Sequence, residues 1–225
     1  MSMTGMTEPR DRLASAQGGA EAGPEPRGDI VPCFTSGTRI ATPSGQRRVE
    51  DLKPGDKVLT RDNGLQEIRW IGGCRLDAAA LRASPGLRPV RVRSGALDDS
   101  LPDSDILVSP WHKILIQSDK TAAFFEDSEV LASACHLTGW AGIDVVDVDR
   151  VTYVHFMFER HQVVLSNGFW TESFCPDRQV MRSLDNGQRR RLLELFPDLA
   201  DPRRRDVYRP ARRTLSETES HLLTG

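Results

Sequence analysis

The chain has 225 residues, enough for one sizeable domain of about 140 to 180 residues with tails. Its 30 basic and 32 acidic residues give a net charge of −2, which offers no general attraction to nucleic acid or to anionic lipid. No apolar run approaches the roughly 18 residues of a membrane span, and the first residues are polar where a signal peptide is apolar. The composition predicts a cytoplasmic protein with no nucleic-acid or membrane partner, and it leaves secretion by a non-classical route open.

The cysteines are too scattered for a metal site or a disulfide framework. Cys33, Cys74, Cys135 and Cys175 lie far apart, without the CxxC spacing of a zinc site. We expect neither a metal nor an external cofactor. All but Cys33 are interpreted as small buried hydrophobes or unreactive thiols, because free cysteine is among the most buried residue types.

The predicted elements divide the chain into three parts. Residues 1–30 are rich in Gly, Ala, Pro, Glu and Arg, and such a segment buries too little apolar surface to fold, so a disordered leader is expected. Residues 31–175 consist of short apolar runs bounded by Gly, Pro, Asn or Asp, the spacing of an all-β fold of many short strands. Tight turns are predicted at residues 62–64 and 167–168, because Asn-Gly accommodates positive φ angles. Residues 176–225 are predicted to be a polar helical tail.

Two helices are expected in that tail. The first covers residues 186–196, because three apolar side chains recur at helical spacing: Leu192, Leu195 and Phe196. Asp185 is a suitable N-cap and Pro197 a stop signal, and the apolar stripe predicts that this helix lies on the β domain. The second helix is indicated by Thr214 and Glu217, which have the spacing of a capping box.

Three sequence blocks carry a resemblance to a known superfamily. The first reads CFTSGTRIATP over residues 33–43 and VEDLKPGDKVL over residues 49–59. The second reads DILVSPWHKIL over residues 105–115, and the third covers residues 153–170 with its HQVVLSNG turn. Together they resemble the Hint (Hedgehog/intein) superfamily, and in particular the bacterial intein-like Hint proteins. The resemblance implies a horseshoe-shaped β fold of many short strands.

The resemblance also implies an autocatalytic reaction at the start of the first block. Cys33 would attack the carbonyl of Pro32 through a five-membered ring and convert the peptide bond into a thioester, with the chain's own N-terminal segment as substrate. Water, a thiol or an amine would then cleave the thioester. His112 would act as an acid on the Cys33 nitrogen, and the Ser109 hydroxyl would hold that histidine or the scissile amide.

Two further histidines are candidates, although a single histidine on a strand is more often structural. His155 falls within a residue of the place where inteins often carry a group that assists the first step, which makes it the second candidate general acid or base. His161 matches the histidine that precedes the final strand, where it would take part in the site or only shape it.

Two departures from the intein pattern limit the expected reaction. Glu172 and Ser173 stand where inteins carry the His-Asn pair that releases the spliced product, so full protein splicing is not expected. Pro32 precedes the nucleophile, and the hindered carbonyl of proline is a slow acyl donor.

Other functions remain open at this point. The first is a non-catalytic Hint-fold module for interaction or structure, favoured by the shortness of the leader that cleavage would release. The second is a Cys-His hydrolase acting on other proteins. A sterol acceptor, as in Hedgehog proteins, is disfavoured because the region after residue 175 is rich in arginine. Neither the acceptor nucleophile nor the oligomeric state follows from the sequence.

Overall fold

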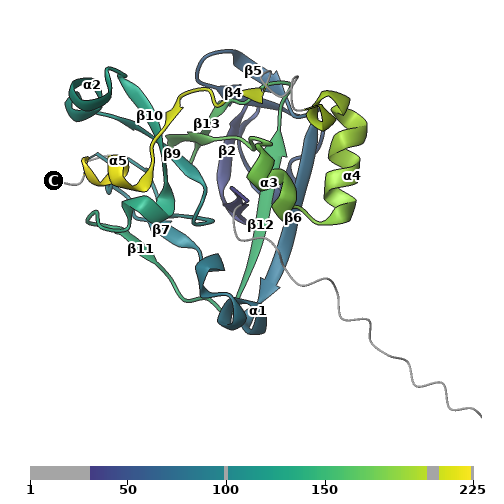
Figure 1. The fold of residues 1–225 in the computed structure, drawn as a ribbon, viewed down its shortest axis with the longest axis horizontal. Helices are drawn as coiled ribbons and strands as arrows, with labels where there is room; N and C mark the ends of the chain where they lie inside the picture. The colour runs from purple at the N-terminus through teal and green to yellow at the C-terminus, as the bar shows by residue number, and fades with distance from the viewer. Residues whose placement is uncertain (1–30, 99–100, 202–207, 224–225) are drawn as a thin grey trace, which may run out of the picture.

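The computed structural model describes residues 31–98, 101–201 and 208–223. The leader predicted over residues 1–30 lies outside the described residues. The described chain forms two β-sheets with a few short helices and no closed barrel, as Figure 1 shows. This confirms the predicted all-β class with a helical C-terminal appendix. None of the helices in the described residues has the length and apolar character that a membrane crossing needs.

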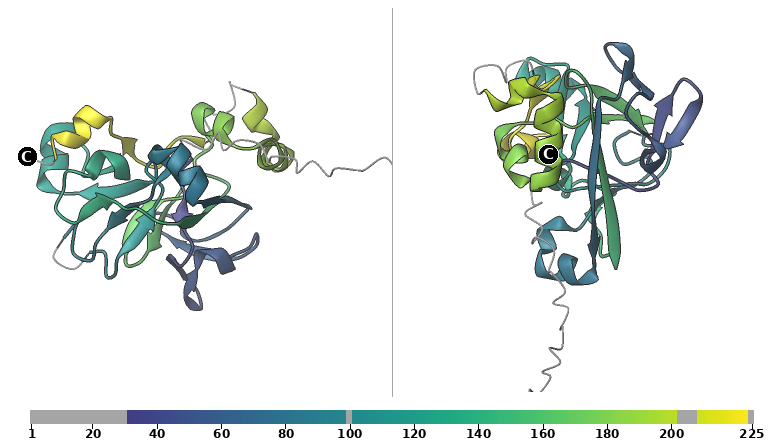
Figure 2. Two further views of the ribbon diagram at one scale, coloured as in Figure 1. Left: turned by 90° about the horizontal axis from the view of Figure 1, so that it is seen from below. Right: turned by 90° about the vertical axis from the view of Figure 1, so that its right-hand side faces the viewer.

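The first sheet positions the candidate nucleophile. Its six strands run in the order β11-β7-β8-β1-β12-β6, and every pair is antiparallel. Strands β6 and β12 pair along eight positions and form the long ribbon that stands upright in the right-hand view of Figure 2. The bounds are β1 Phe34–Thr35, β6 Trp70–Asp77, β7 Val90–Val92, β8 Ile106–Val108, β11 Ile143–Val145 and β12 Arg150–Met157.

The second sheet runs in the order β15-β10-β9-β14-β13-β2-β3, and β4 joins it by pairing with β13 and with β5. The strand β15, from the end of the chain, adds to β10 in parallel. The bounds are β2 Arg39–Thr42, β3 Gly45–Arg48, β4 Lys57–Thr60, β5 Gly64–Glu67, β9 Lys113–Gln117, β10 Glu129–Ser133, β13 Val163–Ser166, β14 Phe169–Glu172 and β15 Arg213–Thr214.

Hairpins form at both predicted Asn-Gly pairs, but only the pair at residues 167–168 makes the expected type I′ turn, because Asn63 has no positive φ and lies in a three-residue loop between the paired Thr60 and Gly64. Gly64 closes the β4–β5 hairpin with a φ of 60°. Asn167 and Gly168 close the β13–β14 hairpin with φ angles of 43° and 82°. Positive φ at both central residues is the requirement of a type I′ turn, which the twist of a two-residue hairpin favours.

Five α-helices lie among the described residues, with bounds α1 Ala78–Ala83, α2 Asp119–Phe125, α3 Arg178–Ser183, α4 Asn186–Leu195 and α5 Glu217–His221. The helix predicted over residues 186–196 is confirmed as α4, and the side chain of Asp185 caps it. Leu192 and Phe196 are buried as predicted, but Leu195 is 56% exposed, so its expected packing was wrong.

The capping box expected from Thr214 to Glu217 was also wrong. Thr214 belongs to β15, and the capping box that starts α5 runs from Ser216 to Glu219. Thr-x-x-Glu and Ser-x-x-Glu overlap here, and the pairing of Thr214 with Leu131 in the sheet favours the later start.

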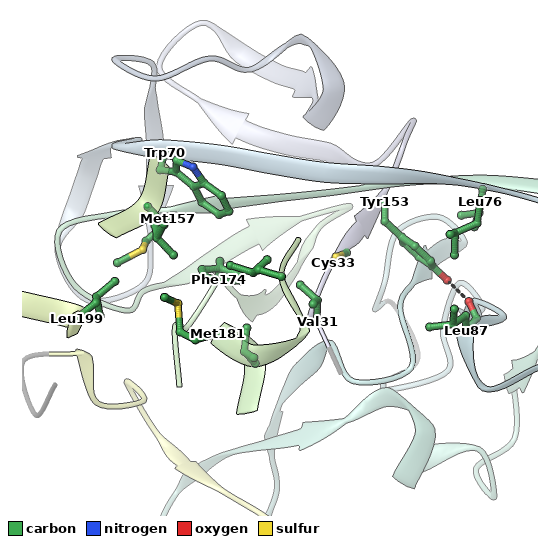
Figure 3. Close-up of a cluster of buried hydrophobic side chains, with 14 of the residues drawn as sticks. Val31, Cys33, Trp70, Leu76, Leu87, Tyr153, Met157, Phe174, Met181 and Leu199 are labelled. Atoms are coloured by element: carbon green, nitrogen blue, oxygen red, sulfur yellow. Dashed lines mark hydrogen bonds between the residues drawn. The ribbon is translucent and has the colours of Figure 1, made fainter. Parts of the chain in front are cut away.

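The C-terminal appendix packs on the first sheet through an apolar cluster. Trp70 and Met157 from β6 and β12 belong to one buried cluster with Phe174 after β14, Met181 of α3 and Leu192 of α4. Figure 3 shows the first four side chains converging beside Cys33. The tail therefore contributes core residues as well as a polar surface. Cys33 itself is 3% exposed within this cluster.

Two of the other thiols differ from expectation. Cys74 is exposed and Cys135 is only partly buried, whereas Cys175 is buried as expected. Cys74 lies on the same face of β6 as the buried Trp70 and Leu76, and it is exposed because it lines an open cavity at that face.

Candidate functional site

The register of the first sheet brings three predicted residues together. Strand β1 lies between β8 and β12, and Phe34 is paired with Val108 on one side and with Val154 on the other. In an antiparallel pair, the residue before a given position on one strand lies opposite the residue after the paired position on the neighbouring strand. Cys33, one position before Phe34, therefore faces Ser109 and His155.

The backbone nitrogen of Cys33 is bound by Ser109. The Cys33 N–H donates to Ser109 Oγ at 2.7 Å, and the Ser109 hydroxyl donates to the carbonyl oxygen of Val31 at 3.0 Å. The Ser109 N–H donates to the Cys33 carbonyl oxygen at 2.9 Å. Pro32, between the two residues that Ser109 contacts, is buried. Ser109 thus forms hydrogen bonds with the backbone on both sides of the Pro32-Cys33 peptide bond.

The thiol of Cys33 points to the imidazole of His155. Cys33 Sγ lies 3.1 Å from His155 Nδ1. Burial raises the pKa of the Cys33 thiol well above its usual value, with a smaller contribution from Cys74. Burial also lowers the pKa of His155 to about 4, although Gln188 and Asp185 oppose this shift. Both groups are therefore neutral at neutral pH, and the tautomer of the imidazole decides which of the two atoms donates the hydrogen bond.

Aromatic rings enclose the imidazole of His155. The Trp70 ring stacks on it with 5.1 Å between centroids, and the Phe174 ring lies 5.0 Å away. Such packing holds the plane of the imidazole and excludes water from its faces. The remaining hydrogen bond is made at Nε2, which lies 3.1 Å from Gln188 Oε1 of α4.

His112 and Ser109 are the two ends of one β-turn between β8 and β9. The His112 N–H donates to the Ser109 carbonyl oxygen at 3.0 Å, and Pro110 is at the second position, where its fixed φ favours such a turn. The His112 ring packs 4.4 Å from the ring of Phe34. Neither ring nitrogen has a hydrogen-bond partner within the described part of the chain. Burial lowers the pKa of His112 to about 4, against an opposing effect of Glu172.

His161 is placed in a neighbouring buried network rather than on the thiol. Its Nε2 lies 3.1 Å from the Ser173 carbonyl oxygen and 3.3 Å from Glu172 Oε2, and its Nδ1 accepts from the Ala211 N–H. Lys113 Nζ lies 3.1 Å from the same carboxylate. Burial disfavours the charge on Glu172, but Lys113 and His161 outweigh it and lower the pKa of Glu172 to about 2.

A cavity of about 1090 Å³ opens beside the nucleophile. Cys33, Ser109 and His155 line one part of it, and Trp111 and residues 182–189 line other parts. The site is therefore reachable by a small molecule even though the thiol itself is buried. Among the described residues, no group of three or more His, Cys, Asp or Glu side chains is arranged to hold a metal ion.

Gln188 was missed by the sequence analysis. A hydrophobic pattern identifies only the apolar face of a helix, and Gln188 lies off that face. A weaker signal was available, because Asp185 and Gln188 have the N-cap to N3 spacing of a capping box. That spacing predicts a side chain folded back over the start of the helix, where Gln188 meets β6 and His155.

Cys33, the candidate nucleophile, directly precedes the first strand of this two-sheet β domain. A sequence model of the Hint domain family matches residues 32–178, and the chain belongs to that family. The fold is similar to that of the gp41-1 intein, at 13% identity and a TM-score of 0.39 over 62% of this chain and 97% of that one. It is also similar to a bacterial intein-like domain from Clostridium thermocellum, at 16% identity and a TM-score of 0.40 over 63% and 97%. No curated protein sequence matches the chain.

Proposed function

We propose that this Hint domain cleaves its own chain at the Pro32-Cys33 bond by an N-to-S acyl shift, without protein splicing. The observation that carries the proposal is that Cys33 is contacted at both its thiol and its backbone nitrogen. The thiol of Cys33 lies 3.1 Å from a neutral imidazole nitrogen, while its backbone nitrogen, the leaving group, is bound to Ser109 at 2.7 Å. Nucleophile, base and leaving-group partner thus meet at a single peptide bond.

In the first step, Cys33 Sγ attacks the carbonyl carbon of Pro32 and the thiol proton passes to His155 Nδ1. Because the base removes the proton during the attack, the attack needs no free thiolate. The raised pKa of the Cys33 thiol therefore does not prevent it. The ring that forms contains the carbonyl carbon, the nitrogen, the two carbons and the sulfur of Cys33. Breakage of the carbon–nitrogen bond then leaves a thioester on Sγ and an amine on Cys33.

The departing nitrogen gains one proton in this step. We assign its donation to protonated His112, because His112 ends the turn whose first residue, Ser109, already binds that nitrogen. The proton held by His155 then leaves to solvent, and His112 takes up another, so that the net change is the transfer of the thiol proton to the amine.

An external nucleophile completes the reaction. Water, a thiol or an amine enters the cavity beside Cys33, attacks the thioester carbonyl and releases the segment that ends at Pro32. Joining that segment to anything downstream is not expected, because Glu172 occupies the place of the cyclising residues. Its carboxylate is held by the Lys113 backbone and side chain and by His161.

The test is the intact mass of the purified full chain, incubated with and without dithiothreitol or hydroxylamine. We expect two fragments cut between Pro32 and Cys33, with the first carrying the added nucleophile. Cys33→Ala abolishes the cut, and the matched thiol variant Cys135→Ala cleaves like wild type. Pro32→Gly accelerates it by unhindering the carbonyl.

Two outcomes contradict the proposal. Cleavage that survives in Cys33→Ala belongs to a contaminating protease. A chain that stays whole even as Pro32→Gly supports the alternative, a Hint-fold module retained for interaction or structure.

A further inference from the structure

We infer that Gln188, which lies beyond the part of the chain matched by the Hint family, is a positioning residue that makes His155 the base for Cys33. The inference rests on the proposed function and names a further working part of the same site. The family match ends at residue 178, and Gln188 lies on α4, which begins at Asn186.

The orientation of the Gln188 amide is determined by its partners on β6. The Gly73 N–H donates to Gln188 Oε1 at 3.0 Å, and Gln188 Nε2 donates to the Gly73 carbonyl oxygen at 3.2 Å. Nε2 also donates to the Asp185 carboxylate. If the amide were flipped, its NH₂ group would face the Gly73 N–H, a donor against a donor. Its oxygen would face the Gly73 carbonyl oxygen and the Asp185 carboxylate, an acceptor against an acceptor at each contact. The oxygen must therefore face His155.

That oxygen selects one tautomer of His155. Gln188 Oε1 can only accept, so His155 Nε2 carries the ring proton at their 3.1 Å contact. Nδ1 is then left with its lone pair directed at Cys33 Sγ, 3.1 Å away. In the other tautomer, Nδ1–H would meet the thiol and Nε2 would face an oxygen lone pair, and no base would face the nucleophile.

The space for this contact depends on Gly72. Gly72 is paired with His155 across β6 and β12. A Cβ at Gly72 would lie 2.3 Å from Gln188 Oε1 and 2.5 Å from His155 Nε2. Any other residue there would separate the two atoms of the hydrogen bond, so glycine is required for α4 to reach the imidazole.

The position of Gln188 is itself held from both sides. The Asp185 carboxylate accepts from the Gly187 and Gln188 N–H groups and caps α4. One turn later, Leu192 is fully buried against the sheet. The helix thus presents the amide on a rigid support.

The first experiment reads the tautomer of His155 directly, by nitrogen NMR of the imidazole in Cys33→Ala, which cannot react. We expect the proton on Nε2 in this protein, and a mixture of tautomers when Gln188→Ala is added. The proton on Nδ1 in Cys33→Ala, or an unchanged tautomer after Gln188→Ala, overturns the inference. This readout decides it even if the wild-type chain proves unable to cleave.

The second experiment measures the cleavage rate in the full chain under excess thiol. Gln188→Ala should slow cleavage on the order of 10- to 100-fold, as loss of a group that orients a catalytic histidine does. Gln188→Glu keeps an acceptor for Nε2 but loses the donors to Gly73 and Asp185, so it should react faster than Gln188→Ala and more slowly than wild type. Gln179→Ala, a glutamine change on the exposed face of α3, is the matched control and should react like wild type.

The outcomes separate the two claims. Equal slowing in Gln188→Ala and Gln188→Glu would show that the amide only docks α4, and it would overturn the role of the acceptor. Wild-type rates in Gln188→Ala would overturn the inference and leave the proposed function intact. Absence of cleavage in every variant would overturn the proposed function alone.

Discussion

The imidazole of His112 is buried without a hydrogen-bond partner for either nitrogen among the described residues. An unpaired buried polar group costs about 1 to 3 kcal/mol. Folding retains that cost at a residue whose backbone N–H binds the Ser109 carbonyl oxygen, and the Ser109 side chain in turn binds the Cys33 nitrogen. In the proposed reaction, this unsatisfied imidazole is suited to a partner that exists only while the bond breaks, the departing nitrogen of Cys33.

The acid role of His112 predicts an unusual pH dependence. The pKa of His112 is lowered to about 4. At pH values above 4, the protonated fraction of His112 therefore rises about tenfold for each unit by which the pH falls. His155 stays neutral over the same range because its pKa is also about 4. Thioester formation should therefore speed up as the pH falls from about 8 to about 6, measured with thiol in sufficient excess that trapping is not rate-limiting.

His112→Ala should slow thioester formation by about 10²- to 10⁴-fold and flatten this pH dependence. A slope that is equal in wild type and His112→Ala would remove His112 from the role of acid, and would leave the His155 contact with Cys33 unaffected.

At the scale of elements, α4 depends on a single buried leucine. Leu192→Ala should destabilise the protein by about 2 to 5 kcal/mol, because it removes a fully buried side chain from the core. It should also slow cleavage, since Gln188 moves with the helix. Leu195→Ala is the matched control on the same helix, and with its side chain 56% exposed it should change the free energy of unfolding by less than about 0.5 kcal/mol.

Urea denaturation measures both changes. Equal stability of the two leucine variants would mean that α4 is held by its cap and by Gln188 rather than by packing.

Elements with a local cause were predictable from the sequence. Asn167 and Gly168 reveal the β13–β14 hairpin because the turn itself needs their positive φ angles. The boundary of α4 followed from Asp185, whose carboxylate makes the cap. Helices α1 and α2 went unpredicted, because with six and seven residues they are too short to show a period of 3.6 residues.

The site was only partly predictable for the same reason. Sequence blocks indicated Cys33, Ser109 and His155, and the sheet register brings them together. His161 was a candidate as well, yet it lies against Glu172 rather than on the thiol, and nothing in the sequence near it predicts that contact. Gln188 reaches the site through a contact with β6 across 115 positions of chain, and no local pattern carries that information.

At the scale of the whole molecule, acid should unfold the protein early. His112 and His155 have folded pKa values of about 4, below the value of about 6.5 in an unfolded chain. The unfolded state therefore binds protons first, and stability present above about pH 6.5 is lost as the pH falls toward 4, by about 3 kcal/mol for each histidine. Glu172, with its pKa at about 2, adds a loss at lower pH.

Urea unfolding at a series of pH values from about 7 to about 4.5 checks this linkage. His112→Gln should lose part of the pH dependence. A free energy of unfolding that stays flat across the range would show that the two imidazoles are protonated in the folded protein.

The separations within the site bear on when cleavage can begin. The partners Ser109 and His155 lie 76 and 122 positions after Cys33, and Gln188 follows 33 positions after His155. A ribosome makes these residues in that order, at about 5 to 20 residues per second, and such long-range pairings close slowly. The proposed reaction therefore predicts that the Pro32-Cys33 bond stays an ordinary amide until these residues have been made and have folded together. If the proposed reaction occurs, cleavage is expected only after translation has passed α4, the helix that carries Gln188.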